Sequence, residues 1–564
     1  MRRRDFLARG MAGAAALLGA AVPSRAAQEQ AAGRRGIGGL TADVAIAGGG
    51  LGGCAAALTL LKAGRRVILT EETDWIGGQL TQQGVPPDEH PWIETHGSTR
   101  TYRELRQGIR DYYRAYYPLT AAARARADLN PGSGSVSRLC HEPRVALAVL
   151  EGMLAPYSSG GRLVLLREHR PVGADTKGDR VAAVELLNLR TGRRVWLEAP
   201  YFIDATELGD LLPLTDTEFV TGAEARAETG EPHGAERADP ANQQAFACCF
   251  AMDYVAGEDH TIERPRDYDR WRSFAPRLRP PWPGRLLSLT YSHPRTLEPR
   301  TLGFNPEGPT PGAPVNLWTY RRIAAASNFE PGTYPGDISL VNWPQNDYLG
   351  GNLVGVSERE AHRHIESARQ LSLSLLHWLQ TEAPRPDGGQ GWKGLRLRPD
   401  ILGTADGLAK YPYVRESRRI EAVFTVLEQH VTGPAAPGAP PIGTTFFDTV
   451  GVGSYPVDLH PTSGGDNYVD FPSVPFHIPL GALLPIRVQN LIPASKNIGT
   501  SHVTNGCYRL HPVEWSIGEA AGGLVAIALE RQVPPRRVRD VRSLLDELQA
   551  RLRASGVDVG WPTG

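Results

Sequence analysis

The chain has 564 residues, more than one compact domain usually holds, so two domains or a large domain with an inserted second one are expected. Lys and Arg together number 61, Asp and Glu together also number 61, and no long block of either sign occurs. This balance argues against a nucleic-acid partner and a polybasic membrane surface, and it favours a small-molecule partner.

Residues 1–26 have the features of an export signal. M-R-R-R-D-F-L carries a twin-arginine pair at Arg3 and Arg4, a mildly apolar stretch follows, and a cleavage site is expected near Ala26. A disordered basic tail is the alternative. The signal predicts recognition by the twin-arginine export machinery and a periplasmic or secreted protein. That route resembles one used by proteins that bind a cofactor before export, so a cofactor is expected.

After a Gly- and Ala-rich linker over 27–40, the pattern predicts a compact βαβ unit with strands at 44–47 and 67–70 and a helix over 54–63. Gly48, Gly50 and Gly53 between them satisfy G-x-G-x-x-G, which allows a tight turn and a close approach of backbone to a pyrophosphate. The motif alone is weak. Glu71 at the end of the second strand supplies the carboxylate that binds a ribose hydroxyl, so a dinucleotide is expected.

Helical spacing follows at 104–117 and 143–154, and short strands are predicted at 163–166, 181–187, 195–197 and 201–204. Residues 215–345 have no readable periodicity. A capping box at Ser357 predicts a helix to about Ala383, a Gly- and Pro-rich loop covers 431–443, and a last amphipathic helix carries Val538, Val541, Leu545, Leu548 and Leu552. After residue 30, no run of 18 or more apolar residues occurs, so no stable membrane span is expected. The five scattered cysteines are expected to be buried small hydrophobes, and the adjacent Cys248 and Cys249 leave a redox pair as the minority alternative.

Three further segments bear on the choice between nicotinamide and flavin: D-W-I-G-G-Q-L-T after Glu71, Y-F-I-D-A-T-E-L-G-D-L-L at 201–212, and N-L-I-P-A-S-K-N-I-G-T-S-H near the C-terminus. With these segments the chain resembles the FAD-dependent oxidoreductases of the glutathione-reductase-type flavin fold. The resemblance is closest to a bacterial branch, through C-H-E-P-R-V-A-L-A-V-L, N-W-P-Q-N-D-Y, Y-V-R-E-S-R-R-I and S-Y-P-V-D-L-H-P, and it spans most of 41–530.

The resemblance implies an α/β fold: a Rossmann-like FAD-binding domain in two parts (41–215 and 476–530), an inserted α+β substrate domain (216–475), and a C-terminal helix within 531–564. It assigns the FAD pyrophosphate to Gly48, Gly49, Gly50 and Gly53, and the adenosine ribose to Glu71. It places Gly77, Gly78 and Asp204 along the FAD and Asn497 and Ile498 beside its pyrophosphate or ribityl chain. The helix that begins near Pro512 would direct its positive end at the flavin C2 carbonyl.

The chain departs from that family pattern at two points. The closely spaced cysteine pair of the disulfide reductases is missing after the first βαβ unit, and G-G-Q-G at 388–391 lacks the preceding strand of a second dinucleotide motif. The sequence therefore predicts that electrons come from the enzyme's own substrate and pass to oxygen, a quinone or a carrier.

Several side chains are candidates for the chemistry. His502 is expected on the loop that faces the flavin, as a base, although a loop histidine bonded to backbone is the alternative. Arg415 and Arg418 are candidates to clamp an anionic group, or else to pair with Glu416 or Glu421. Asp458 and His460 are interpreted as a turn between prolines. The tryptophans at 318, 343, 378 and 392 carry no weight, because a large core uses such residues anyway.

His362 and His364 are separated by two positions on the helix that Ser357 caps, so their side chains point to different sides and are expected on a solvated face rather than in a metal site. Together these observations predict an exported FAD-dependent oxidoreductase that oxidises a small organic substrate by hydride transfer to flavin. The alternatives are a saccharide lyase-like enzyme whose flavin has no net redox role, and a secreted flavin-containing binding protein.

Overall fold

A computed structural model describes residues 39–433 and 442–562. The expected signal peptide at 1–26, all but the last two residues of the linker, and residues 434–441 of the Gly- and Pro-rich loop lie outside the described residues.

A parallel five-stranded sheet forms the centre of the fold, in the order β23-β8-β2-β3-β4. Its strands are β2 (Val44–Ala47), β3 (Val67–Glu71), β4 (Leu163–Arg167), β8 (Tyr201–Asp204) and β23 (Leu491–Pro493). β2 pairs in parallel with both β3 and β8, and it is buried along its whole length. Because β23 pairs with β8, a segment near the C-terminus completes a sheet begun by residue 44. The expected Rossmann-like fold is confirmed.

Two helices pack on this sheet with their backbones in close contact: α2 (Leu51–Lys62) and α13 (His511–Arg531). A methyl group at Gly518 would lie 2.2 Å from the carbonyl oxygen of Gly52, and one at Gly52 would lie 1.6 Å from the carbonyl oxygen of Ala494. Only glycine fits at these positions, which explains the Gly- and Ala-rich composition of the C-terminal helix. α13 begins at His511 with Pro512 in its first turn, as predicted.

A second sheet has four strands in the order β1-β7-β6-β5. These are β1 (Leu40–Thr41), β5 (His169–Lys177), β6 (Arg180–Asn188) and β7 (Arg194–Glu198). The sequence predicted β6 and β7, but not β1, which begins in the expected linker, nor β5, whose polar and half-buried residues give no clear alternation. The predicted strands at 163–166 and 201–204 belong to the parallel sheet instead. The helices α3 (Arg100–Tyr116) and α5 (Pro143–Ser159) match the predicted helical segments and extend beyond them by a few residues.

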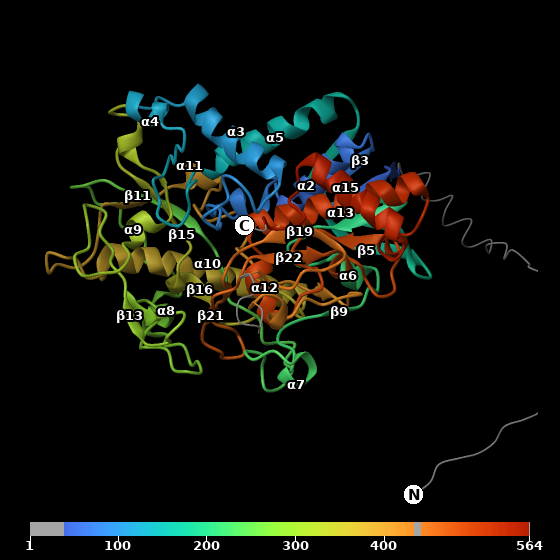
Figure 1. The fold of residues 1–564 in the computed structure, drawn as a ribbon. Coiled ribbons are helices and arrows are strands. Elements are labelled where there is room, and N and C mark those ends of the chain that lie inside the picture. Colours follow the sequence, from blue (N-terminus) through green and yellow to red (C-terminus); the bar gives the residue numbers. More distant parts are fainter. Residues whose placement is uncertain (1–38, 434–441, 563–564) are drawn as a thin grey trace, which may run out of the picture.

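The inserted region contains an antiparallel sheet in the order β14-β15-β11-β17. The strands are β11 (Phe250–Tyr254), β14 (Arg322–Ala324), β15 (Ile338–Val341) and β17 (Leu395–Leu397). Its long helix α10 (Glu358–Thr381) is capped by Ser357, whose hydroxyl accepts the N–H of Glu360, as the capping box predicted. We call this inserted region a lobe. A second hydrophobic cluster fills it and includes Trp318, Trp343, Trp378 and Trp392. In Figure 1 the lobe lies on the left and α2 on the right.

Shorter strand pairs and helices accompany these sheets. The two-stranded pairs are β10 (Phe246–Ala247) with β16 (Asp347–Tyr348), β9 (Phe219–Val220) with β18 (Arg419–Ile420), β12 (Thr290–Ser292) with β13 (Pro299–Thr301), β19 (Thr449–Gly453) with β22 (Phe476–Pro479), and β20 (Val457–Leu459) with β21 (Val469–Phe471). The short helices are α4 (Ala121–Ala125), α6 (Leu211–Leu214), α7 (Arg226–Thr229), α8 (Tyr268–Ser273), α9 (Leu317–Tyr320), α11 (Pro399–Leu402) and α12 (His502–Tyr508).

The prediction of a single last helix was wrong. Two helices, α14 (Pro535–Asp540) and α15 (Arg542–Ser555), meet at Val541, whose extended backbone with ψ of 112° breaks the helical path. The apolar stripe still docks, because Val538, Leu545 and Leu552 are buried. All five cysteines are unpaired and buried, as predicted. Within the described ranges, no helix is long and apolar enough to cross a bilayer.

Candidate active site

The glycine motif forms a tight loop between β2 and α2. Gly48 has φ of +95°, and a methyl group on it would lie 2.2 Å from the carbonyl oxygen of Ala205. A methyl group at Gly53 would lie 2.0 Å from the carbonyl oxygen of Gly48. Gly50 is the N-cap of α2 and brings no side chain to the first N–H groups of the helix. The start of α2 thus has no capping side chain from its own N-cap residue, an arrangement that leaves backbone donors to bind an anion at a helix N-terminus.

Glu71 ends β3 directly beside this loop. Its Oε2 accepts the N–H of Gly49 at 3.0 Å, and its Oε1 accepts the N–H of Thr73 at 2.8 Å and the amide of Gln82 at 3.0 Å. Burial raises the pKa of Glu71 to about 8, against the opposing effect of the Thr73 and Gly49 N–H groups. The carboxyl group lies where the sequence motif required it.

Gly77 and Gly78 lie against the same loop. The N–H of Gly77 donates to the carbonyl of Gly49 at 2.7 Å, and a methyl group on Gly78 would lie 3.0 Å from Cα of Gly50. The structure therefore brings the two separate glycine segments together, as the sequence suggested.

Three further predicted residues lie near this loop, namely Asp204, Asn497 and Ile498. Their side chains contact other parts of the protein. Asp204 accepts the N–H and hydroxyl of Thr206 at 3.0 and 2.7 Å and the N–H of Leu211 at 3.1 Å. Burial raises the pKa of Asp204 to about 7. Asn497 donates its amide to the carbonyl of Asp204 at 3.0 Å, and Ile498 is fully buried. These residues join the loop after β8 to the loop after β23.

A carboxylate occupies the N-terminus of α2. Oε1 of Glu514 accepts the N–H of Gly52 at 3.3 Å and the hydroxyl of Ser495 at 3.1 Å, while Oε2 accepts the amide of Gln79 at 2.6 Å. A second buried pair joins Lys496 to Glu207 at 2.6 Å. Burial and the neighbouring charge of Glu207 act to raise the pKa of Glu514, against the effect of Lys496.

These observations test whether FAD fits. The helix end already holds an anion, and methyl groups on Gly48 and Gly53 would close the turn that lets backbone approach a ligand. A cavity of about 20 Å³ lies along the loop, lined among others by Gly50, Glu71 and Arg170. A dinucleotide is larger than this cavity, so its binding would require nearby side chains to move. The backbone donors at the start of α2 and the carboxyl group of Glu71 are groups of the kind that would hold FAD.

A larger cavity of about 320 Å³ lies beyond Gln79. Residues of the inserted region line it together with Asp88 and Arg509 from the FAD-binding part of the chain. Gln79 joins it to the glycine loop: its amide donates to Glu514, which binds Gly52, and its carbonyl accepts the hydroxyl of Tyr413 at 3.2 Å. Tyr413 lines the cavity. Other lining residues are Asp88, Arg321, Arg415, Tyr455, Asp458, His460, Tyr468 and Arg509.

Several charges in this cavity wall are paired. Arg321 lies 3.3 Å from Asp88, and Arg509 lies 3.1 Å from Asp458. Arg415 lies 2.9 Å from the carboxylate of Asp347, which is buried and is not among the residues that line the cavity. Burial raises the pKa of the Tyr455 and Tyr468 hydroxyls well above their ordinary value, so both stay protonated hydrogen-bond donors. The cavity is therefore polar without a large net charge.

The model of the family described as FAD dependent oxidoreductase matches residues 43–552. The chain belongs to this family. It is therefore an enzyme that uses FAD, and the glycine loop and Glu71 lie at the start of the matched region.

No curated protein matches the oxidoreductase. Three solved structures are similar to it at low identity. The anhydrotetracycline hydroxylase OxyS from Streptomyces rimosus is 12% identical over 91% of this chain and 66% of its own, with a TM-score of 0.31. The myxobacterial chondrochloren halogenase is 11% identical over 91% and 79%, with a TM-score of 0.32. The L-proline dehydrogenase from P. horikoshii is 16% identical over 33% of this chain and 24% of its own, with a TM-score of 0.17.

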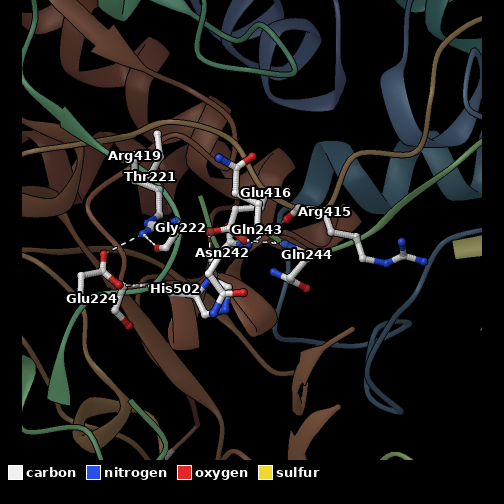
Figure 2. A network of polar contacts seen from close by, with 12 residues as sticks. Thr221, Gly222, Glu224, Asn242, Gln243, Gln244, Arg415, Glu416, Arg419 and His502 are labelled. Atoms are coloured by element: carbon white, nitrogen blue, oxygen red, sulfur yellow. Dashed lines mark hydrogen bonds and ion pairs between the residues drawn. The ribbon is translucent and has the colours of Figure 1, made fainter. Parts of the chain in front are cut away.

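The structure separates the three catalytic candidates of the oxidoreductase. Arg415 lies in the cavity wall, whereas Arg418 donates to the carbonyl of Leu208 at 2.8 Å and pairs with Asp210 at 3.2 Å. His502 lines a different, open groove of about 1020 Å³. In Figure 2 the side chain of Arg415 points away from His502.

His502 is the first residue of α12 and belongs to a buried ionic network. The ring Nδ1 of His502 lies 2.9 Å from Glu416, which also accepts a hydrogen bond from Arg419 at 2.6 Å. The backbone N–H of His502 donates to Glu224 at 2.8 Å (Figure 2). Burial lowers the pKa of His502, but Glu416 outweighs it and the pKa is raised. The role of His502 as a base stays a prediction.

Sequence reasoning missed most of the side chains between the loop and the cavity, namely Gln79, Glu207, Tyr413, Lys496, Arg509 and Glu514. It also interpreted Asp458 and His460 as a turn, whereas Asp458 lies in β20, His460 follows that strand, and both line the cavity. The alternation V-D-L-H was the available signal, because Val457 and Leu459 are buried and the two polar residues share the opposite face.

Proposed function

We propose that this oxidoreductase oxidises a small organic substrate in the cavity beside Tyr413 and passes the electrons to oxygen, a quinone or a carrier. The observation that carries the proposal is the contact path from Gly52 through Glu514 and Gln79 to Tyr413. This path links the glycine loop to a polar cavity of about 320 Å³ through the side chains of Glu514, Gln79 and Tyr413. Cavities of this volume suit small-molecule ligands.

Each part of the site has a separate task. FAD, when bound, supplies the acceptor for two electrons, which leave the substrate as a hydride. The glycine loop and Glu71 would hold the cofactor. The tyrosines and arginines of the wall would orient the substrate through hydrogen bonds, and the buried wall would exclude water.

The test is a spectral titration. The purified protein is expected to carry flavin absorbance, and a panel of hydroxy compounds (glycerol, glucose, lactate and benzyl alcohol), added without oxygen, is expected to include at least one that bleaches it. Tyr413→Phe should keep the flavin spectrum but slow the bleaching. A flavin that stays oxidised while a saccharide is cleaved would instead favour a lyase-like activity, and one inert to every compound would favour a binding protein.

We also propose export through the twin-arginine pathway. Arg3 and Arg4, the apolar stretch behind them and the small residues near Ala26 support it. A fusion of residues 1–40 to a reporter is expected to reach the periplasm of a bacterial host. Replacement of both arginines by lysine should hold the reporter in the cytoplasm, and unchanged export would exclude this route.

A further inference from the structure

We propose that His460, held by Asp347, is the base that takes the substrate's proton in this oxidation. The inference rests on the proposed function and names a residue that the sequence interpreted as part of a turn. His460 lies in the wall of the cavity that adjoins the glycine loop.

Asp347 fixes the histidine ring. Its Oδ2 lies 2.6 Å from Nδ1 of His460, and Arg415 lies 2.9 Å from its other oxygen. The carboxylate is buried, and β16, which contains it, pairs with β10. The backbone N–H of His460 donates to the side chain of Gln244 at 3.2 Å. Ring and backbone are thus both anchored.

The contact with Asp347 decides the tautomer. An ionised carboxylate only accepts hydrogen bonds, so Nδ1 carries the proton and donates it. The lone pair of the neutral ring then lies on Nε2. Oδ2 of Asp458 is 3.7 Å from Nε2, beyond hydrogen-bonding distance. Nε2 is therefore free to accept a proton, and the carboxylate stabilises the imidazolium that results.

Most other described residues that line the cavity are poorer proton acceptors. Asp470 also lines it; burial raises the pKa of this carboxyl group, and Arg295 binds it at 2.7 Å. The arginines stay charged and have no acceptor, and the buried tyrosines stay protonated. Asp88 and Asp458 are bound by Arg321 and Arg509. Although burial acts to raise the pKa of Asp458, His460 and Arg509 lower it, which makes this carboxylate a weak base.

Charged and titratable groups face His460 or the carboxylates beside it from several elements. They are Asp347 on β16, Asp458 on β20, Asp470 on β21, Tyr468 before β21, Arg415 before β18 and Arg509 between α12 and α13. His502 faces a different set, Glu416 and Glu224, in the separate groove.

The step balances for a substrate hydroxyl. The O–H bond breaks, its proton moves to Nε2 of His460, and its electron pair forms the new C=O bond. The C–H bond breaks in the same oxidation, and its two electrons would leave with the hydrogen as a hydride, for which FAD, when bound, would supply the acceptor. The imidazolium later releases the proton to water.

The first experiment needs no substrate. Diethyl pyrocarbonate modifies neutral imidazole nitrogens, and peptide mapping gives a rate for each histidine. His460 is expected to react although it is only partly exposed, because it lines the cavity, and Asp347→Asn should slow its reaction. His511 and His141 are fully buried and serve as internal controls that should not react. A His460 that stays unmodified overturns the proposal, whether or not any compound reduces the flavin.

The second experiment uses the compound of the panel that bleaches the flavin fastest. His460→Ala is expected to lower the limiting rate of flavin reduction by about 100-fold or more while the flavin spectrum and substrate affinity are kept. Added imidazole should restore part of the rate, which a merely structural role would not allow. Asp347→Asn should lower the same rate without loss of substrate affinity. His362→Gln, on the exposed face of α10, is the matched control. An unchanged limiting rate in His460→Ala, or a loss that imidazole does not restore, overturns the proposal.

Discussion

The carboxylate of Glu514 lies 3.3 Å from the backbone nitrogen of Gly52, although 462 positions separate the two residues in the chain. Gly52 is in the first turn of α2, where the helix dipole favours negative charge. Glu514 itself is in the first turn of α13. The C-terminal segment therefore places a carboxyl group at the helix end that the N-terminal glycine motif forms.

Glu514→Gln is expected to tighten FAD binding several-fold. The amide keeps the shape of the side chain but removes a negative charge that competes with a pyrophosphate for the start of α2. The dissociation constant can be measured by flavin fluorescence with the apoprotein. Glu547→Gln on α15 is the control. Weaker binding of FAD by Glu514→Gln would show that the carboxylate helps to hold the cofactor.

Glu71→Arg is expected to abolish FAD binding, since it removes the ribose-binding carboxylate and brings a larger cation into a buried position. The ratio of flavin to protein absorbance after purification measures the effect. Glu104→Arg, an exposed change on α3, should keep a full complement of flavin. Retention of FAD by Glu71→Arg would refute the ribose assignment.

Gly53→Ala is expected to destabilise the protein by about 1–3 kcal/mol or more, because the new methyl group meets the carbonyl oxygen of Gly48 at 2.0 Å. Gly152→Ala is the matched control: Gly152 is exposed within α5 and a methyl group there meets nothing within 4 Å. That change should stabilise the helix by about 0.5–1 kcal/mol. Urea unfolding of both variants measures the difference, and equal midpoints would contradict the close packing at Gly53.

The pair of His502 and Glu416 predicts a pH window for stability. Burial acts to raise the pKa of Glu416, but His502 and Arg419 lower it to about 2, so its contribution is present above its unfolded pKa, about 4.3, and is lost as the pH falls toward 2. The raised pKa of His502 gives a contribution that is complete below its unfolded pKa, about 6.5, and is lost as the pH rises through the folded pKa. The pair should therefore stabilise most between about pH 4.3 and 6.5.

His502→Gln should remove the loss of stability that the pair predicts as the pH rises through the folded pKa of His502. Thermal unfolding between pH 5 and 9 is the measurement, and the gap between wild type and variant is expected to be larger at pH 5 than at pH 9. His362→Gln should run parallel to wild type at every pH, because His362 is exposed. A gap that does not change with pH would mean that the ion pair does not form in solution.

Local signals were sufficient for much of the fold. Residues 43–71 showed the strand, turn and helix pattern of a βαβ unit. The position of Glu71 at the end of the second strand was predicted from its spacing after the glycine motif. Ser357 capped α10 as its side chain required. The prediction failed for β5, which lacks alternation, and at Val541, where the backbone turns between two helices that share one apolar stripe.

The sequence by itself predicted the glycine loop, Glu71 at the end of the next strand and the kind of cofactor, because these depend on residues close together in the chain or on spaced family motifs. Only the tertiary structure decided what lies around the substrate. Asp347, Arg415, His460 and Arg509 come from four separate segments, and no local pattern shows which of them face one another. Their contacts exist because β10 pairs with β16 and β20 packs against α12, and this packing also places His502 in another groove.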